Sequence, residues 1–548
     1  MRFSLAHVRE WASGVPAGDP SPFTAVSMSS RLDGWPPMRP GGLFVAIGGG
    51  RRDGNDFVAE AFAIGAAAAL VDHVPDGLAG AVADGRVQVL NLSSYGGASY
   101  GAPSGFHPYA ESVPTLVVVD PGIGTMGTLQ ELGGWWRRRW GGPVVAIAGS
   151  VGKTTTKDLA VAVLSRQFRT LGTEGNLNNE LGLPITLLRL THSHEVAAVE
   201  VGISAPGEMA AFSAIAAPDV AVLTSIEAEH LEFLHDIETV EREEGTLVEG
   251  LAPSGTAVLN ADDPRVLAMA GRTQARVLTY GEAPGAHVQA RDVHSRGLDG
   301  VTFRLWHDGR GVPVTLPLAG RHFTSAALAA AAAGFALGAS HETVVAGLES
   351  TPVAPRIRVL RPDDELVVID DTYNASPASC IAALDLLAEA PGAHVAILGD
   401  MLELGDFTSL AHTTVGAHVP GRAARLIAVG EASRGIAAAA IAGGMAPGDV
   451  AWVPNAADAA GAFETWRRAA GASTRFTVLV KGSRGMRMER VAQILAKRTA
   501  SAAVELSKAA TEEPSSSVAQ RLRRGSYSPQ PLPRCDGRGA PEGMGVGS

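Results

Sequence analysis

The segment AGSVGKTTTKD, residues 148–158, has the residue types and spacing needed to bind and transfer a phosphate group. An apolar run at 144–148 precedes the glycine-rich turn at 149–152, and a helical pattern at 154–164 follows it, so the turn lies between a predicted strand and a predicted helix. The backbone N–H groups of such a turn, together with the helix N-terminus, form a cradle for phosphate oxygens. Lys153 would contact the β- and γ-phosphates, and the hydroxyl of Thr154 would bind Mg²⁺.

The turn departs from the general phosphate-loop pattern at one position. The pattern G-x-x-x-x-G-K-[ST] places its first glycine at position 147, where this chain has Ile147. The strand, the tight turn and the Lys-Thr pair that opens the helix are all retained. A purely structural Gly-Lys turn is the alternative, and the flanking strand and helix favour a nucleotide site. The residues expected to bind the nucleotide phosphates here are Gly149, Ser150, Val151, Gly152, Lys153, Thr154 and Thr155.

Two residues farther along the chain could hold a metal ion. Glu200 follows a predicted strand at 195–199, and His230 follows another at 219–226. Because open α/β sheets bind ligands at the carboxyl ends of their strands, both side chains could lie near the phosphate loop. A glutamate after a strand is often only a solvated turn residue, but the phosphate loop upstream favours the metal. Imidazole is an unusual ligand for Mg²⁺, so the residues by themselves favour a structural role for His230.

The elements that must position these residues alternate between strand and helix. From about residue 143 to 347, and again from about 352 to 499, short apolar runs alternate with helical stretches, which predicts parallel sheets with helices on both faces. A chain of 548 residues has room for about three domains. We expect an α/β fold with domains at 1–140, 141–350 and 351–499, the last two built on doubly wound sheets. The composition of residues 500–548, rich in Ser, Pro, Arg and Gly, is typical of a disordered tail.

Composition narrows the class of protein. The net charge of −11 argues against a nucleic-acid binder, because there is no basic excess to neutralise phosphates. Two distant cysteines, Cys380 and Cys535, predict neither a disulfide framework nor a zinc site. The N-terminus does not resemble a secretory signal, and the alanine-rich run 325–340 is shorter than the roughly 20 residues of a membrane span. We therefore expect a soluble cytoplasmic protein in which 325–340 is a buried helix. The basic run 137–139 is typical of a solvated helix end.

Beyond the phosphate loop, several segments resemble the Mur ligase family of ATP-dependent ligases. The segment VVAIAGSVGKTTTKD is similar to the ATP loop of that family, and EVGISAPGEM (200–209) and EAEHLEFL (227–234) are similar to its metal-binding motifs. GNLNNELGLPITLL (175–188) resembles the segment that faces the UDP-muramoyl substrate. DDTYNASPAS (370–379), LGDMLELGDFT (398–408) and VKGSRGMRME (480–489) resemble the branch that adds D-alanyl-D-alanine. The resemblance covers roughly residues 25–498.

The resemblance implies an architecture and a reaction. It implies an N-terminal UDP-binding α/β domain, a central ATPase-type domain with the phosphate loop, and a C-terminal Rossmann-like domain. The implied reaction joins D-alanyl-D-alanine to UDP-N-acetylmuramoyl-tripeptide through an acyl phosphate, in the synthesis of cell-wall precursors. ATP and Mg²⁺ are the implied cofactors, both substrates are small molecules, and we expect a monomer that neither binds nucleic acid nor inserts into a membrane.

The resemblance also implies roles for individual residues. The catalytic residues would be Lys153, Glu200 and His230. The metal ligands would be Thr154, Glu200, His230 and Glu244. ATP would further contact Arg356 and Asp371, the latter at the end of the first predicted strand of the third domain. The substrate-binding residues would be Ser30, Arg31, Asn178, Asn179, Tyr373 and Asn374.

Three departures from the family pattern leave alternatives open. Glu244 stands where the family has a carbamoylated lysine, Ala326 where it has an asparagine near the adenine, and Ser29 where it has an aspartate. One alternative is a ligase of the same type with a different amino-acid or peptide acceptor. Another is a catalytically impaired homologue that only binds the nucleotide. Retention of Lys153, Thr154, Glu200 and His230 argues against the second alternative.

Overall fold

The computed structural model describes residues 3–13, 23–28, 37–48, 53–92, 113–229, 231–350, 357–471 and 474–497. Residues 1–496 form a compact unit, whose described part contains three β-sheets. The tail predicted at 500–548 lies outside the described residues. The three sheets confirm the α/β class, whereas the domain boundaries expected at 140, 350 and 499 stay predictions.

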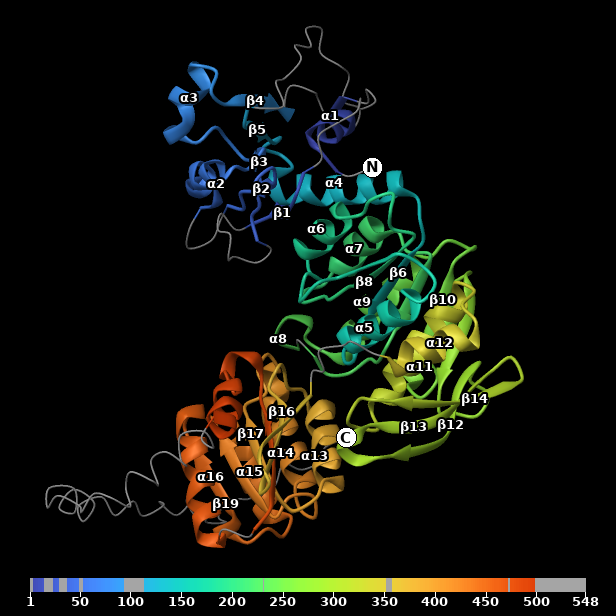
Figure 1. Cartoon of the computed structure of the whole chain (residues 1–548), viewed down its shortest axis with the longest axis vertical. Helices are drawn as coiled ribbons and strands as arrows, with labels where there is room; N and C mark the ends of the chain where they lie inside the picture. The colour runs from blue at the N-terminus through green and yellow to red at the C-terminus, as the bar shows by residue number, and fades with distance from the viewer. Residues whose placement is uncertain are drawn as a thin grey trace, which may run out of the picture. The chain divides into compact units, whose positions relative to one another are not determined.

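The first sheet is parallel throughout, with the strand order β1-β2-β3-β5-β4. Its strands are short and mostly buried, and the long helix α4 follows the last of them (Figure 1). The strands are β1 (Val26–Ser27), β2 (Leu43–Val45), β3 (Ala68–Val71), β4 (Gln88–Asn91) and β5 (Thr115–Val118). The helices are α1 (Leu5–Ser13), α2 (Val58–Ile64), α3 (Ala79–Ala83) and α4 (Gly124–Trp140).

The C-terminal end of α4 corrects one expectation from the sequence. Arg137 is buried, although the basic run 137–139 is typical of a solvated helix end. Its guanidinium donates hydrogen bonds to the carbonyl oxygens of Ala216 and Ala217, both at 2.8 Å, and pairs with Asp219 at 2.8 Å. Arg137 therefore joins α4 to the central sheet, and its buried charge is compensated by acceptors from another segment of the chain.

The second sheet has nine strands in the order β14-β13-β12-β11-β10-β9-β6-β8-β7. The strands from β7 to β12 pair in parallel with their neighbours, as the strand–helix alternation predicts. β13 pairs with both β12 and β14 in antiparallel fashion. The sheet is therefore mixed, and the sequence does not predict its antiparallel end. The strands are β6 (Val144–Ala148), β7 (Thr170–Gly172), β8 (Val196–Glu200), β9 (Val220–Leu223), β10 (Thr256–Asn260), β11 (Arg276–Gly281), β12 (Val288–Ser295), β13 (Val301–His307) and β14 (Arg310–Leu316).

Helices cover both faces of the parallel part, because successive side chains of a strand point to opposite sides. In β6, Val145 and Ile147 belong to one apolar core with α5, α11 and α12, whereas Val144 and Ala146 belong to another with α4, α6, α7 and α9. Figure 1 shows α11 and α12 in yellow, near α5. The helices are α5 (Lys153–Leu164), α6 (Gly182–Leu188), α7 (Glu208–Ala216), α8 (Leu231–Leu234), α9 (Ile237–Glu249), α10 (Pro264–Ala268), α11 (Phe323–Ala336) and α12 (His341–Glu349).

The alanine-rich helix α11 is buried along most of its length, as the sequence predicts. Small side chains allow neighbouring backbones to approach closely, and α11 and α12 both pack against α5. At Gly347 a Cβ atom would lie only 2.4 Å from the Cα of Val163 in α5. Of the helices that the structure describes, none is both long enough and apolar enough to span a membrane.

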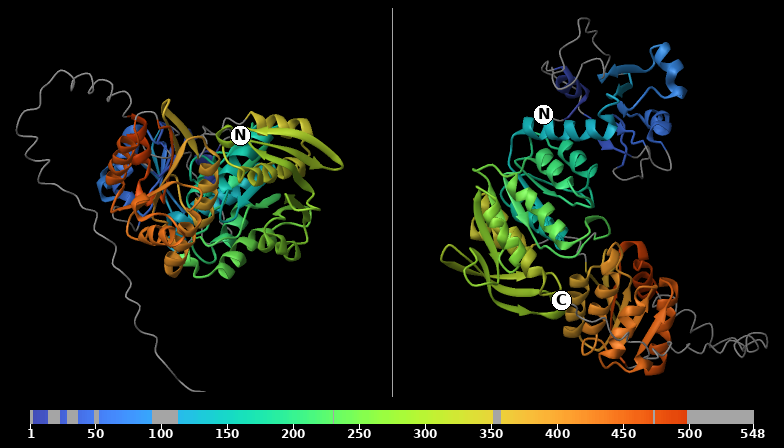
Figure 2. Two further views of the ribbon diagram at one scale, coloured as in Figure 1. Left: turned by 90° about the horizontal axis from the view of Figure 1, so that it is seen from below. Right: turned by 180° about the vertical axis from the view of Figure 1, so that it is seen from behind.

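The third sheet has the order β15-β16-β20-β17-β18-β19. Its core strands are parallel, with α13, α14 and α15 on one face and α16 and the helix that begins at residue 489 on the other (Figure 2). An antiparallel edge strand precedes the strand predicted to be the first, so Asp371 ends the second strand of this sheet. The strands are β15 (Arg358–Asp363), β16 (Leu366–Asp371), β17 (Ala393–Gly399), β18 (Arg425–Val429), β19 (Val450–Val453) and β20 (Phe476–Lys481). The helices are α13 (Pro377–Glu389), α14 (Thr408–His418), α15 (Arg434–Ala442) and α16 (Ala456–Ala470).

Candidate active site

The turn between β6 and α5 has a backbone conformation that requires glycine. Gly149 has φ +114°, and a Cβ there would lie 2.3 Å from the hydroxyl oxygen of Thr224. Gly152, with φ +90°, immediately precedes α5, which begins at Lys153, one residue earlier than expected. The loop is tied to the residues after β9: the N–H of Ser150 donates to the carbonyl oxygen of Ser225 at 2.8 Å. The strand end and the following segment thus fix a tight turn at the N-terminus of α5.

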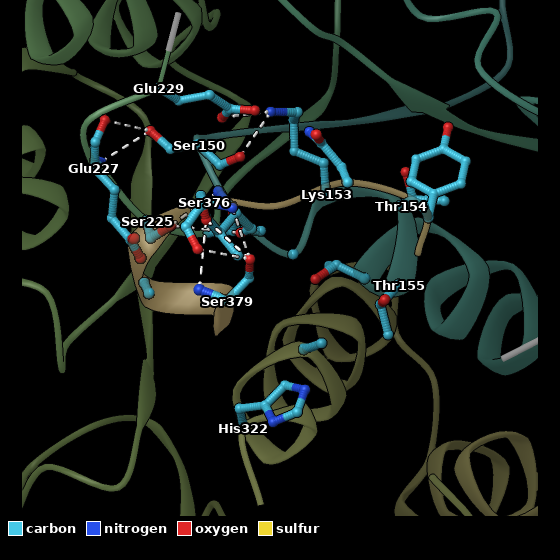
Figure 3. Close-up of a pocket in the computed structure, with 18 of the residues that line it drawn as sticks. Ser150, Lys153, Thr154, Thr155, Ser225, Glu227, Glu229, His322, Ser376 and Ser379 are labelled. Atoms are coloured by element: carbon cyan, nitrogen blue, oxygen red, sulfur yellow. Dashed lines mark hydrogen bonds and ion pairs between the residues drawn. The ribbon is translucent and has the colours of Figure 1, made fainter. Parts of the chain in front are cut away.

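Lys153 lies against its own loop. Its Nζ donates to the carbonyl oxygen of Gly149 at 2.5 Å and of Ser150 at 3.0 Å, and it pairs with Glu229 at 3.3 Å (Figure 3). Burial lowers the pKa of Lys153, but nearby carboxylates, Glu229 foremost, outweigh this and raise the pKa above its usual value. Lys153 is therefore a cation held at the entrance to the phosphate cradle.

Thr154 and Glu200 are brought together by the sheet. The hydroxyl of Thr154 donates to Glu200 Oε2 at 2.6 Å, and Asn178 donates from its side-chain amide to Glu200 Oε1 at 2.8 Å. Glu200 is the last residue of β8 and is buried, so it lies at the carboxyl edge of the sheet rather than in a solvated turn. A hydroxyl and a carboxylate oxygen suit Mg²⁺, which commonly keeps water and phosphate oxygens as its other ligands. The described residues contain no group of three or more His, Cys, Asp and Glu side chains arranged to hold a metal ion.

Glu244, on α9, contacts the phosphate loop directly. Its side chain is buried, and Oε2 accepts a hydrogen bond from the N–H of Gly149 at 2.9 Å. Burial raises the pKa of Glu244 to about 7, even though Lys153 and the Gly149 N–H both favour the carboxylate. From the sequence, Glu244 is expected only as a metal ligand, and that role stays a prediction. Its contact with the loop backbone depends on the packing of α9 and has no sequence signal.

Two acidic residues beside the loop were not singled out from the sequence. Glu227 exchanges hydrogen bonds with Ser150: its N–H donates to Ser150 Oγ at 2.9 Å, and its carbonyl oxygen accepts from that hydroxyl at 3.2 Å (Figure 3). Burial, followed by the charges of Glu229 and Asp263, raises the pKa of Glu227 to about 7. Glu229 is the ion-pair partner of Lys153. Both lie in the loop that follows β9, which ends at Leu223, and in the segment 227–234 that resembles a metal-binding motif, and this position is the signal that could have identified them.

A cavity of about 550 Å³ joins this loop to segments from elsewhere in the chain. Ala326 contributes an apolar methyl group to its wall, and His322 also lines it. Asp371 also lines it and pairs with Lys481 at 2.6 Å. The predicted site residues that line this cavity are Ser150, Val151, Gly152, Lys153, Thr154, Thr155, Asn178, Asn179, Glu200, Asp371, Tyr373 and Asn374.

The structure gives no position for four of the predicted site residues. Ser30, Arg31, His230 and Arg356 lie outside the described residues, and their roles stay predictions.

Comparison with known proteins gives a consistent assignment. The family model of the Mur ligase middle domain matches residues 147–334, and the model of the Mur ligase glutamate ligase domain matches residues 355–484. The chain is 32% identical over 462 residues to the UDP-N-acetylmuramoyl-tripeptide–D-alanyl-D-alanine ligase of Escherichia coli, a match that covers 84% of this chain and 91% of that enzyme. The chain belongs to the Mur ligase family. It is therefore an ATP-dependent ligase that forms an amide bond.

Further relatives share most of the chain. The ligase of the same name from Bacillus subtilis is 34% identical over 406 residues, which cover 73% of this chain and 79% of that one. The crystal structure of MurF from Acinetobacter baumannii superimposes with a TM-score of 0.74 at 28% identity, covering 91% of this chain and 99% of that one. MurF ligase from Thermotoga maritima, solved in complex with ADP, has the same fold, with a TM-score of 0.68 at 24% identity over 87% of this chain and 98% of that one.

Proposed function

We propose that this chain joins D-alanyl-D-alanine to UDP-N-acetylmuramoyl-tripeptide with ATP, in the synthesis of peptidoglycan precursors. The names of its relatives support the assignment of these two substrates to this chain. The observation that carries the chemistry is the cavity in which the phosphate loop, Lys153 and the Thr154–Glu200 pair meet Tyr373 and Asn374. Such a cavity can bring the terminal phosphate of a nucleotide close to the reacting ends of the other two substrates.

The proposed reaction has two steps whose atoms balance. In the first, an oxygen of the tripeptide's terminal carboxylate attacks the γ-phosphorus, the bond from that phosphorus to the bridging oxygen breaks, and ADP leaves. In the second, the dipeptide amine attacks the carbonyl carbon of the acyl phosphate, phosphate leaves with the bond electrons, and the nitrogen loses a proton. Lys153 and the loop N–H groups stabilise the charge that moves onto the phosphate oxygens. A closed cavity protects the acyl phosphate from water.

The charge of the cavity wall supports a role for a divalent cation. The described lining includes the carboxylates of Glu200, Glu227 and Glu229, against the ammonium of Lys153 on the same wall. A nucleotide triphosphate and a carboxylate substrate would add further negative charge. We propose that Thr154 and Glu200 hold Mg²⁺, which would offset the charge on the phosphate oxygens when it is bound.

The location and assembly of the protein belong to the same proposal. Because ATP and UDP-linked precursors are cytoplasmic metabolites, we place the reaction in the cytoplasm. The expected monomer stays a prediction, which light scattering on the purified protein would test.

Phosphate release tests the proposed function. Purified protein with ATP, Mg²⁺ and UDP-N-acetylmuramoyl-tripeptide should release phosphate when D-alanyl-D-alanine is added and not before, and Lys153→Met should abolish this release. Release that needs a different acceptor would identify a ligase with another specificity. ATP binding without turnover under any acceptor would contradict the proposal and indicate a nucleotide-binding homologue.

A further inference from the structure

Two segments leave the third sheet side by side at its carboxyl edge. β16 and β20 are parallel neighbours, and Asp371 at the end of one lies opposite Lys481 at the end of the other. We call residues 371–376 the strand-end loop and residues 481–484 the clamp segment. Five residues of the strand-end loop, among them Tyr373 and Asn374, line the same cavity as the phosphate loop. The conformation of this loop therefore shapes one wall of the cavity.

The clamp segment contacts the strand-end loop at successive positions. Lys481 Nζ donates to Asp371 Oδ2 at 2.6 Å and to the carbonyl oxygen of Asn374 at 2.9 Å. Ser483 follows with a hydrogen bond from its hydroxyl to the carbonyl oxygen of Ala375 at 3.4 Å. The guanidinium of Arg484 lies 5.1 Å from the centre of the Tyr373 ring. Lys481 makes the shortest of these contacts, and it spans the loop from its first residue to its fourth.

The ion pair is buried, and burying it is costly. Lys481 is 2% exposed and Asp371 is 8% exposed. Removing two charges from water can cost as much as their attraction returns, so a buried pair is poor evidence for added stability and better evidence for a required geometry. The second acceptor of Lys481 is a main-chain carbonyl, so the ammonium constrains the backbone of the loop as well as the carboxylate.

We propose that Lys481 is a positioning residue, which acts through Asp371 and the Asn374 carbonyl to hold the strand-end loop in place for the acceptor dipeptide. The inference rests on the proposed function. Lys153 and Thr154, the groups proposed to bind the nucleotide phosphates, lie at the start of α5. Tyr373 and Asn374, by contrast, are polar groups on the cavity wall that Lys481 braces. In this assignment Asp371 serves the loop through its pair with Lys481, and the contact with ATP that the family resemblance implies stays a prediction.

Charge-removing variants test the inference. Lys481→Met should raise the KM for the acceptor and lower kcat, so that kcat/KM for the acceptor falls by about tenfold or more. Small misplacements of reacting groups can lower the reaction rate on the order of 100-fold. The Kd for ATP, measured by calorimetry without the other substrates, should stay within about twofold of the unmodified protein because the phosphate loop is untouched. Lys481→Arg should recover part of the lost activity. The matched control is Arg467→Met, which removes the cation of a partly buried pair between α16 and the same sheet, with Asp363 at 2.8 Å and away from the cavity.

The double variant D371N/K481M separates positioning from stability. It leaves no buried charge unpaired, so its Tm should recover relative to Lys481→Met while the KM for the acceptor stays high. If the Tm and the acceptor KM of the double variant both returned to the values of the unmodified protein, the inference would be overturned. A rise in the Kd for ATP as large as the rise in the acceptor KM would overturn it as well.

Hydrogen exchange keeps the test independent of the proposed function. Amides of residues 371–379 should exchange faster in Lys481→Met than in Arg467→Met, with no turnover required. If the unmodified protein shows no ligase activity while this exchange difference is seen, the proposed function fails and the bracing of the loop stands. Equal exchange in the two variants would overturn the bracing itself.

Discussion

Single side chains in this site are held by groups that are distant in sequence. Glu200 takes a hydrogen bond from Thr154, which lies 46 residues away, and another from Asn178, which lies 22 residues away. If Glu200 holds Mg²⁺, Asn178 is the group that orients this ligand. Outer partners of metal ligands commonly affect metal affinity strongly.

We expect Asn178→Ala to weaken Mg²⁺ use. The Mg²⁺ concentration for half-maximal phosphate release should rise by about 10–100-fold, because Glu200 loses the donor that fixes its orientation. The control is Asn179→Ala, whose side chain instead accepts from the N–H of Gly182 at 3.0 Å. It should leave the Mg²⁺ dependence unchanged. An equal Mg²⁺ dependence in Asn178→Ala and the unmodified protein would show that Glu200 does not hold the metal.

We expect Glu244→Ala and Glu244→Gln to differ. The alanine variant leaves the Gly149 N–H buried without its acceptor, which should lower the free energy of unfolding by about 1–3 kcal/mol and weaken ATP binding. Glutamine keeps an acceptor oxygen and should retain ATP binding. Calorimetric titration with ATP and urea unfolding measure the two effects. Normal ATP affinity in the alanine variant would mean that the loop does not depend on this contact.

The same residue gives a pH dependence of known sign. The folded-state pKa of Glu244 is about 7, raised from 4.5 by burial, so the folded protein binds this proton more tightly than the unfolded chain does. Its contribution to stability is therefore full below pH 4.5 and is lost as the pH rises through 7. Glu244→Gln should show a smaller fall in the free energy of unfolding between pH 5 and pH 8 than the unmodified protein.

At the scale of elements, α13 begins at the cavity. Ser376 and Ser379 form a capping box there: the Ser379 N–H donates to Ser376 Oγ at 3.4 Å, and the Ser376 N–H donates to Ser379 Oγ at 2.9 Å. Both serines line the cavity (Figure 3). A helix cap usually contributes only to stability. This one also forms part of the cavity wall.

We expect Ser376→Ala to affect both stability and activity. Loss of the cap should cost about 1 kcal/mol of unfolding free energy. Ser340→Ala is the matched control, since Ser340 caps α12 by accepting from the Thr343 N–H at 3.2 Å and lies away from the cavity. The two variants should lose similar stability in urea, and only Ser376→Ala should raise a substrate KM. A KM change of equal size in both would assign the effect to general destabilisation.

At the scale of the whole molecule, the described parts respond to pH through different buried groups. In the N-terminal part, His7 is fully buried, contacts Ser4 Oγ through Nδ1 at 2.7 Å and packs edge-on against Trp136 with ring centres 4.7 Å apart. Burial lowers its pKa to about 4 from 6.5. The unfolded chain therefore binds this proton more readily, and the stabilisation is present above pH 6.5 and lost as the pH falls towards 4.

We expect His7→Gln to reduce the acid sensitivity of this part of the chain. Between pH 7 and pH 5 the unmodified protein should lose stability on the order of 1 kcal/mol more than the variant. Hydrogen exchange of α1 at the two pH values measures the local effect. The exposed His73, replaced by glutamine, is the control and should behave like the unmodified protein. Identical acid sensitivity in all three proteins would rule out His7 as the responsible group.

The sequence by itself determined the structural features that depend only on residues close together in the chain. The strand, glycine turn and helix at 144–164, the buried alanine-rich helix and the alternation of strands and helices are local patterns, and local backbone preferences and hydrophobic period are enough to predict them. The motifs carried the family resemblance for the same reason. Only the tertiary structure decided the antiparallel strands β12–β14, the burial of Arg137, the contact of Glu244 with Gly149 and the pairing of Lys481 with Asp371. The last two contacts join residues 95 and 110 positions apart, and such partners meet only because sheet order and helix packing bring them together.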